Sequence, residues 1–238
     1  MPVNKFRFLV VAGSVVITSA GAAAYALPGP TACLTIAALD LQSASDNVLT
    51  NSVFSVDRQR FKQLTHDARS RISATYGIPE SKPNIVFFTS DKGLGPFTLN
   101  RYGSTNFIGR RACIFIGPNG QNVDVVAHEL MHAELHHRVG AVKRFLEIPT
   151  WFDEGVAMQV DHRKEYDLRK DNAGRIDAVR KLDSSSKFYV PDDRTLTRNY
   201  AMSKAVVDAW LADIGTSALY DRLNRIKAGE TFADAIKQ

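Results

Sequence analysis

The sequence predicts an α+β fold, in which a small mixed sheet packs on a central helix and a mostly helical part follows. Short apolar runs typical of strands are grouped in one region, at 85–88, 106–108 and 112–116. Helical spacing of apolar residues dominates the remainder. The expected helical runs lie near 123–138, 174–182, 196–213, 217–228 and 231–237. Strands that are grouped in one stretch, instead of alternating with helices, are typical of an α+β domain.

An apolar segment lies near the amino end. Lys5 and Arg7 are followed by residues 8–27, a stretch without a charge that is long enough to be an uncleaved transmembrane anchor. It could equally be a cleaved signal peptide, because Ala24-Tyr25-Ala26 offers an A-x-A cleavage site. A buried core helix is the third interpretation. With the basic flank retained inside, the rest of the chain would be extracytoplasmic, either anchored to the membrane or secreted.

The remaining residues divide into a linker and one domain. We expect residues 28–54 to form a polar linker, since Ser, Asn and Thr are frequent in their second half. The domain, 55–238, begins with a helix, because apolar positions from Val56 to Tyr76 recur close to helical spacing and Gly77 ends the run. A chain of 238 residues, 45% of them hydrophobic, allows one core of ordinary size.

Charge and cysteine content narrow the possible partners and compartment. The 25 acidic residues nearly balance the 30 basic ones, and basic pairs such as Arg110-Arg111 are interspersed with apolar and acidic residues. Nucleic-acid binding is therefore not expected. Cys33 and Cys113 could form a disulfide in an oxidising compartment, or Cys113 could be buried alone.

The central helix carries an H-E-x-x-H motif, His128-Glu129-Leu130-Met131-His132. Residues four apart on a helix are separated by about 6 Å along its axis and lie on one face, so both imidazoles can bind one metal ion. Glu129 lies at the border of that face, where a carboxylate can contact a water on the metal without binding the metal. We therefore predict that His128 and His132 bind zinc and that Glu129 is the general base.

A hydrolytic zinc site needs a third protein ligand. His136 is about 12 Å along the helix from His128 and cannot share the ion, so we expect it in solvent. The metzincin pattern is absent, because Leu135 and Arg138 occupy the positions of its Gly and third His. Glu154, on a second helical run at 149–157, remains as the third ligand, with Asp153 or a water as the alternative.

At this point the sequence resembles a known family. The motif at 128–132, followed by Trp151-Phe152-Asp153-Glu154-Gly155-Val156-Ala157, is similar to the gluzincin metallopeptidases of the compact peptidase MA-like group. The resemblance covers roughly 84–238. It implies a zincin-like fold and one Zn²⁺ per chain, held by His128, His132 and Glu154. The G-x-M-E-N segment of aminopeptidases in this clan is missing, which disfavours an exopeptidase.

The resemblance implies two further site features. In gluzincins an edge strand pairs with the substrate backbone, and we expect the strand at 112–116, which leads into the zinc helix, to do so; a covered edge is the alternative. Tyr200 corresponds to a family tyrosine that faces the metal, which makes it the candidate oxyanion donor ahead of Tyr166 and Tyr189, although it could equally be a core tyrosine. His162 is expected on the same helix as Glu154, facing water.

The expected function is a membrane-anchored or exported zinc endopeptidase that hydrolyses peptide bonds with a metal-activated water. Its partners would be a peptide or protein substrate and the membrane. The alternative is a catalytically silent zincin-like scaffold at the membrane. The oligomeric state is left open.

Overall fold

We describe residues 28–94, 100–168 and 178–237 of a computed structural model of the chain. Among these residues no helix combines the length and the hydrophobicity needed to cross a bilayer. The apolar segment 8–27 lies outside the described residues.

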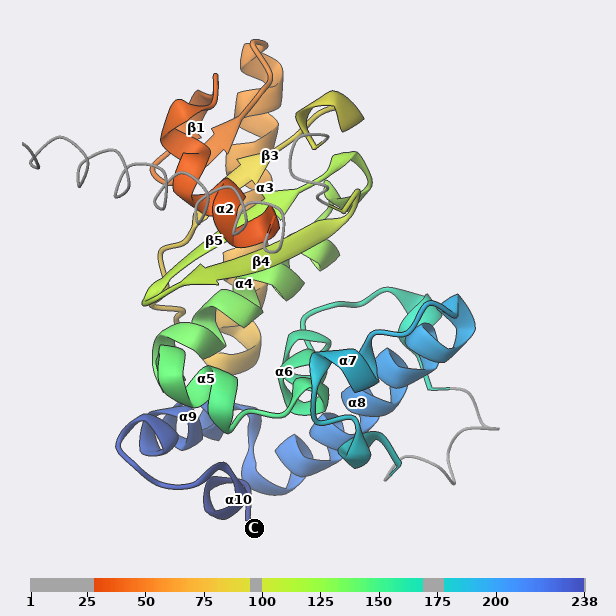
Figure 1. Cartoon of the computed structure of the whole chain (residues 1–238). Coiled ribbons are helices and arrows are strands. Elements are labelled where there is room, and N and C mark those ends of the chain that lie inside the picture. Colours follow the sequence, from red (N-terminus) through yellow and green to blue (C-terminus); the bar gives the residue numbers. More distant parts are fainter. Residues whose placement is uncertain (1–27, 95–99, 169–177, 238) are drawn as a thin grey trace, which may run out of the picture.

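A five-stranded mixed sheet forms one half of the molecule (Figure 1). Its strands are β1 (Gln42–Ser45), β2 (Val48–Thr50), β3 (Asn84–Phe87), β4 (Gly103–Ile108) and β5 (Arg111–Ile116), in the order β1-β2-β3-β5-β4. Strand β3 is parallel to β2 and β5, whereas both outer pairs are antiparallel. The predicted α+β class is confirmed. The prediction that the strand at 112–116 forms the edge of the sheet is wrong: this strand, β5, lies inside the sheet, and β4 forms the edge.

The stretch 28–54, expected as a polar linker, contributes structure to the sheet. Helix α2 (Pro28–Thr35) crosses one face of the sheet, and β1 and β2 extend it. Ala32 and Ile36 are buried in a small cluster with residues of β3 and β5. The linker prediction is wrong for β1 because an outer strand can carry polar side chains and stay half exposed. All four residues of β1 are indeed exposed or half-buried.

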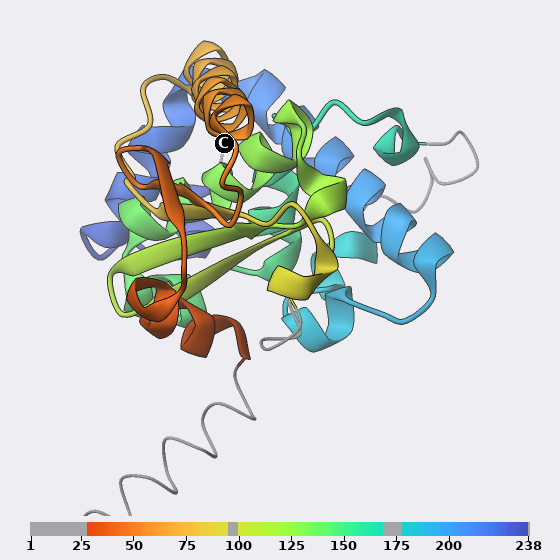
Figure 2. The same cartoon turned by 90° about the horizontal axis from the view of Figure 1, so that it is seen from above.

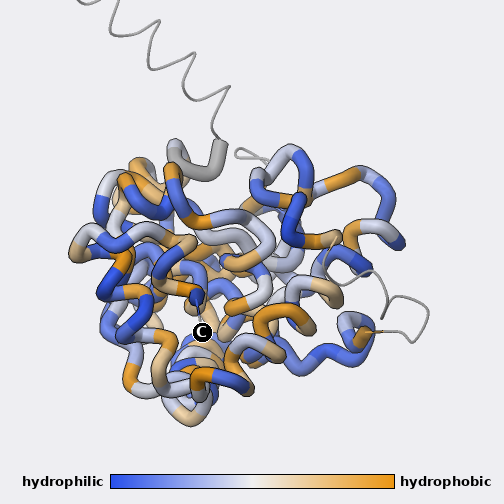
Figure 3. The backbone as a smooth tube through the Cα atoms, turned by 90° about the horizontal axis from the view of Figure 1, so that it is seen from below, coloured by the Kyte–Doolittle hydropathy of each residue, from blue (hydrophilic) through white to orange (hydrophobic). Residues whose placement is uncertain are grey.

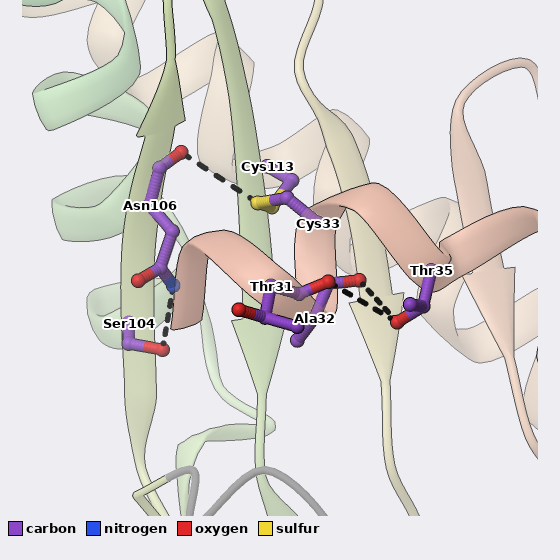
Figure 4. Close-up of a disulfide and its surroundings, with 7 residues drawn as sticks. All are labelled: Thr31, Ala32, Cys33, Thr35, Ser104, Asn106 and Cys113. Carbon is purple, nitrogen blue, oxygen red and sulfur yellow. Dashed lines mark hydrogen bonds between the residues drawn. A yellow bond between two sulfur atoms is a disulfide. The ribbon is translucent and has the colours of Figure 1, made fainter. Parts of the chain in front are cut away.

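A disulfide attaches α2 to the sheet (Figure 4). Cys33 is bonded to Cys113 of β5, with Cα atoms 5.9 Å apart, which answers the open question about these two cysteines. The sulfur of Cys33 also lies 3.9 Å from the carbonyl oxygen of Asn106 on β4. The segment that follows the apolar amino end is thus held covalently against the sheet.

Helices α3 (Ser55–Tyr76) and α4 (Val123–Val139) cover the opposite face of the sheet (Figures 1 and 2). The expected helix before Gly77 is confirmed, and Phe61 of α3 stacks on Phe87 of β3 with ring centroids 4.4 Å apart. Val56, in the first turn, is instead 72% exposed. Asn122 caps the start of α4, where its side chain accepts from the backbone N–H of Val125, and Gly140 caps its end.

Buried polar contacts anchor α4 in the core. Glu134, fully buried, accepts hydrogen bonds from the backbone N–H groups of Glu80 and Ser81 and from Nε of Arg138. Breaking such a buried charged network is costly, because the remaining groups would lack partners. Helix α4 is therefore a rigid support for the side chains that it presents.

The carboxyl-terminal part is helical (Figure 1). Its α-helices are α5 (Ala141–Leu146), α6 (Thr150–Ala157), α7 (Ser185–Phe188), α8 (Asp193–Ile214), α9 (Leu219–Lys227) and α10 (Phe232–Ala235). Short 3-10 helices occupy Ile36–Ala38, Asp91–Gly93, Pro118–Gly120, Lys164–Tyr166 and Thr216–Ala218. The expected run at 174–182 falls partly outside the described residues, and its described end, 178–181, is a single 3-10 turn. Hydrophilic and hydrophobic residues are interspersed along the chain (Figure 3), as expected where helices bury one face.

Helices α6 and α8 pack very closely. A Cβ placed on Gly155 of α6 would lie 2.5 Å from Cγ2 of Val207 and 2.6 Å from the carbonyl oxygen of Ser203, both on α8. Real atoms do not approach that closely. Only glycine fits at this crossing, and the glycine fixes how near α8 comes to the residue before it, Glu154.

Candidate metal centre

Helix α4 directs two imidazoles at one point. His128 and His132 are one turn apart, and both are nearly fully buried, with exposed fractions of 6% and 7%. Their Nε2 atoms lie 3.1 Å from each other. Two ring nitrogens that face one another at this distance are arranged to share a single ion.

Glu154 of α6 completes the cluster from the opposite side. Its Oε2 atom lies 3.3 Å from Nε2 of His128 and 3.5 Å from Nε2 of His132. The residue is 2% exposed, and Oε2 accepts no hydrogen bond. Among the described residues, His128, His132 and Glu154 form a group that could hold a metal ion.

The three donor atoms fit a tetrahedral ion. Zinc binds imidazole nitrogen and carboxylate oxygen at about 2.0 to 2.2 Å, which places neighbouring tetrahedral donors about 3.3 Å apart. The observed separations of 3.1, 3.3 and 3.5 Å bracket that value. Two nitrogens and one carboxylate oxygen also suit zinc chemically and leave the fourth position open, as a catalytic site requires. The residues present therefore fit the ion that the sequence suggested.

Asp153 lies behind His132 and not at the centre. Its Oδ1 atom is 3.0 Å from Nδ1 of His132, and its Oδ2 atom accepts from a guanidinium N–H of Arg144. A carboxylate in this position fixes the tautomer and the orientation of a metal-binding imidazole. Asp153 thus has the position of a supporting residue, and the alternative in which it replaces Glu154 on the metal loses its geometric basis.

A carboxylate also lies on the outer side of His128, but it is too far away for a hydrogen bond. Oδ2 of Asp161 lies 3.7 Å from Nδ1 of His128, which has no hydrogen-bond partner among the described residues. Asp161 is fully buried, and its two carboxylate oxygens accept from the guanidinium of Arg163. Of the two histidines, His132 is therefore the one held by a hydrogen bond to an outer carboxylate.

Tyr189 contacts the third member of the cluster. Its hydroxyl donates to Oε1 of Glu154, the carboxylate oxygen that does not face the histidines. Burial raises the pKa of the Tyr189 hydroxyl well above its usual value, and the charge of Glu154 raises it further. Tyr189 stays a neutral donor that orients the carboxylate.

The charges of the cluster influence one another. Burial alone would lower the pKa of His132, but the charges of Asp153 and Glu154 and the hydrogen bond to Asp153 raise it well above its usual value. Burial alone would raise the pKa of Glu154, but His132 and His128 lower it. A cation at the centre is thus favoured, whether it is a proton or a metal ion.

Glu129 is fixed beside the cluster by β4. The hydroxyl of Thr105 donates to Oε2 of Glu129 at 2.7 Å, and Thr105 also contacts the Glu129 carbonyl oxygen at 2.9 Å. A Cβ on Gly103 would lie 2.9 Å from Cγ and Oε1 of Glu129. The strand therefore passes directly over this carboxylate, which needs glycine at 103.

Tyr200 of α8 lies at the same centre. Its ring centroid is 6.2 Å from that of His128, and it packs edge-on against Phe188 and Tyr166. Burial raises the pKa of its hydroxyl well above the usual value, and the charges of Glu154 and Glu129 raise it further. The residue is thus a neutral tyrosine near the candidate ligands and the candidate base.

Two hollows meet at this centre and form one cleft. They share Asn100, Gly103, His128, Glu129 and Tyr200. The Phe107 hollow, about 240 Å³, continues past Phe107, Arg144 and Tyr189. The Tyr166 hollow, about 380 Å³, continues past the short 3-10 helix at Lys164–Tyr166 and the start of α8. Its lining there comprises Arg163, Glu165, Tyr166, Asp193, Leu196 and Thr197. The candidate metal-binding group thus opens onto a space that extends in two directions.

No known family model matches the chain, and no curated protein matches it in sequence. The residues and their geometry alone therefore indicate a candidate metal centre.

Two expectations about histidines need revision. His136, expected in solvent, is 1% exposed: its Nε2 atom lies 2.9 Å from the carbonyl oxygen of Gly109, and its ring stacks on Phe107. The β4–β5 hairpin covers it, which helical periodicity could not show. His162 is exposed as expected, but it lies beyond α6, which ends at Ala157.

Several residues of the site carry no signal in the sequence. Thr105, Asp161 and Arg144 reach it from a strand, a loop and a short helix that the pattern of apolar residues does not place near the motif. The sequence suggests Tyr189 only as an alternative oxyanion donor, and its contact with Glu154 follows from the fold. An acidic residue next to the predicted ligand was visible at Asp153, and its supporting position follows from the fold.

Proposed function

We propose that this protein is a zinc-dependent endopeptidase of the gluzincin type with a zincin-like fold. The observation that carries the proposal is the cluster of His128, His132 and Glu154, whose donor atoms are spaced as zinc ligands are. The acidic residue next to the first histidine, Glu129, lines the same cleft. A site that only stored zinc would have no use for a buried carboxylate beside an open fourth position.

Each group has a role in peptide hydrolysis. When bound, zinc polarises the scissile carbonyl and lowers the pKa of the attacking water to about 7. Glu129 takes the proton of that water and passes it to the leaving amine, while Thr105 keeps the carboxylate in place. Tyr200 donates its phenolic hydrogen bond to the oxyanion, where negative charge develops in the transition state. Tyr189 and Asp153 hold Glu154 and His132 in place through their hydrogen bonds.

The edge strand supports a peptide substrate. Strand β4 lines the cleft with Gly103, Ser104, Thr105 and Phe107, and it is the last strand of the sheet on that side. An extended peptide can add to such an edge through main-chain hydrogen bonds, which esters and sugars do not offer. We therefore assign the substrate-pairing role to β4, in place of β5.

The location that we propose is extracytoplasmic, either membrane-anchored or secreted. The charge-free segment 8–27 supports it. The disulfide between Cys33 and Cys113 supports it independently, because structural disulfides persist mainly in oxidising compartments.

A scaffold that keeps the zincin shape without turnover is the alternative function. It requires the same fold and permits the same metal, so metal content alone does not distinguish a scaffold from a peptidase. Metal-dependent turnover of a substrate distinguishes them.

The proposal is tested by removing and restoring the metal. Full-length protein in detergent is treated with a chelator, and hydrolysis of an unfolded protein such as casein is followed during titration with zinc. We expect hydrolysis to return with about one zinc per chain. His132→Ala should not recover, whereas the exposed-residue control His162→Ala should recover like the wild type. Hydrolysis that survives complete zinc removal would contradict the proposal.

A further inference from the structure

Three large apolar side chains on α5 are exposed to solvent. Val142, Phe145 and Leu146 have exposed fractions of 69%, 67% and 79%. Their spacing of three and four residues places them on one face of the helix. Clustered apolar surface of this kind marks an interaction site more often than isolated exposed residues do. We call these three residues the α5 strip.

The α5 strip is continuous with the metal-binding cleft. The ring of Phe145 meets the ring of Phe107 edge-on, with centroids 6.3 Å apart, and Phe107 lines the hollow that contains His132 and Glu154. The neighbouring residue on α5, Arg144, lines the same hollow. A path therefore runs from the metal centre over Phe107 to the apolar outer face of α5.

The start of this path is rigid. Phe107 is stacked on the buried ring of His136, with centroids 4.3 Å apart, and the guanidinium of Arg144 lies 5.1 Å from the Phe107 centroid. Arg144 is in turn held by Asp153. An aromatic platform that is fixed on several sides binds an apolar side chain with little loss of conformational freedom.

Both arms of the cleft carry charged side chains. Arg163, Glu165 and Asp193 line the Tyr166 hollow, and Arg144, Asp153 and Glu154 line the Phe107 hollow. The Phe107 side differs in that Phe107 contacts an exposed apolar side chain, Phe145, at the outer face of α5.

We infer that the α5 strip binds large apolar side chains of an extended polypeptide substrate, on the Phe107 side of the cleaved bond. The inference rests on the proposed function and specifies its substrate class: unfolded or extended polypeptides with an apolar cluster beside the cleavage site. Strand β4 supplies the geometry, because it carries both Thr105 beside Glu129 and Phe107 beside Phe145. A peptide that pairs with β4 at the metal is thereby led toward the strip.

The test compares selectivity between variants of the full-length protein. Three quenched fluorescent peptides share one central sequence and carry four Leu or Phe residues on its amino side, four on its carboxyl side, or Ser throughout. The wild type should cleave one apolar-flanked peptide about tenfold faster than the Ser peptide at low substrate concentration. In Phe145→Ser/Leu146→Ser this preference should vanish through a higher KM at unchanged kcat, because the lost contact is remote from the reacting bond.

A matched control and a binding measurement separate the possible failures. Leu34→Ser removes a leucine that is 72% exposed on α2, on the other face of the sheet, and should keep the preference. Binding of the labelled peptides is also measured by fluorescence anisotropy in a Glu129→Gln background. Strip-dependent binding without cleavage by the wild type would sustain the inference and contradict the peptidase proposal. Cleavage with equal preference in all variants would overturn the inference alone.

A lipid surface is the competing occupant. Vesicle flotation with phosphatidylcholine and phosphatidylglycerol measures it for the same variants. Unchanged flotation of Phe145→Ser/Leu146→Ser, together with the lost peptide preference, is the expected result. Reduced flotation with an intact peptide preference would assign the strip to the membrane and overturn the inference.

Discussion

Nδ1 of His132 lies 3.0 Å from Oδ1 of Asp153, so that the opposite ring nitrogen faces Glu154. Adjacent residues of α6 thus act on the two sides of one imidazole. Asp153 holds its outer edge, and Glu154 shares its inner edge. This relationship depends on the close packing of α6 against α4 and α8, and it explains why two neighbouring carboxylates have different roles.

The first prediction concerns Asp153. Asp153→Asn keeps the side-chain volume but removes the charge behind His132, and loss of such an outer partner typically weakens metal binding about 10 to 100-fold. Competition with a chromophoric zinc chelator measures the affinity. Asp183→Asn, a change at an exposed aspartate paired with Lys187, is the control and should bind zinc normally. An affinity within twofold of the wild type in Asp153→Asn would contradict the supporting role.

The second prediction concerns Thr105, which donates to Oε2 of Glu129. Thr105→Val should lower kcat about tenfold or more with zinc content unchanged, because the general base loses its positioning bond. Thr105→Ser, which keeps the hydroxyl, should restore the wild-type kcat. A Val variant with the wild-type kcat would show that Thr105 does not act on the base.

The third prediction separates two tyrosines. Tyr200→Phe should lower kcat by about 10² to 10³ with KM, zinc content and melting temperature little changed, since an oxyanion donor acts only in the transition state. Tyr189→Phe should instead weaken zinc binding, because Tyr189 donates to Glu154. Steady-state kinetics with parallel metal analysis distinguishes them. If Tyr200→Phe keeps its turnover but melts at a lower temperature, Tyr200 is a core residue and the oxyanion donor lies elsewhere.

The fourth prediction concerns the disulfide between Cys33 and Cys113, which closes a loop over a sequence separation of 80. Reduction should lower the free energy of unfolding by about 4 kcal/mol, because the unfolded chain regains the entropy of that loop. Urea unfolding with and without reductant measures the change. The double variant Cys33→Ala/Cys113→Ala should be less stable and insensitive to reductant. Zinc content should not change, since the bond lies on the sheet face away from α4, and a reductant effect in the double variant would disprove the assignment.

Local signals in the sequence were enough to predict the class of the fold and the three candidate ligands. His128, Glu129 and His132 are fixed relative to one another by a single helix, and Glu154 follows on the next long helical run. Long-range packing was not predictable. The burial of His136 depends on the β4–β5 hairpin, and the place of β4 at the edge depends on a strand order that periodicity does not contain.

The supporting residues illustrate the same limit. Asp161 reaches His128 only because the chain turns after Ala157, and Thr105 reaches Glu129 only because Gly103 lets β4 pass over it. The stretch 28–54 looked like a linker because β1 is short, polar and half exposed. The two supporting residues are missed, and the linker prediction fails, because contacts between distant segments outweigh the local sequence pattern.

The most direct test of the central claim is the hydrolysis rate of Glu129→Gln. Wild type and variant are loaded with equal zinc, verified by metal analysis, and assayed on the same unfolded protein. We predict that the variant retains about one zinc per chain and loses at least about two orders of magnitude in rate, because the proton acceptor for the attacking water is gone. Equal rates in the two proteins would contradict the peptidase mechanism.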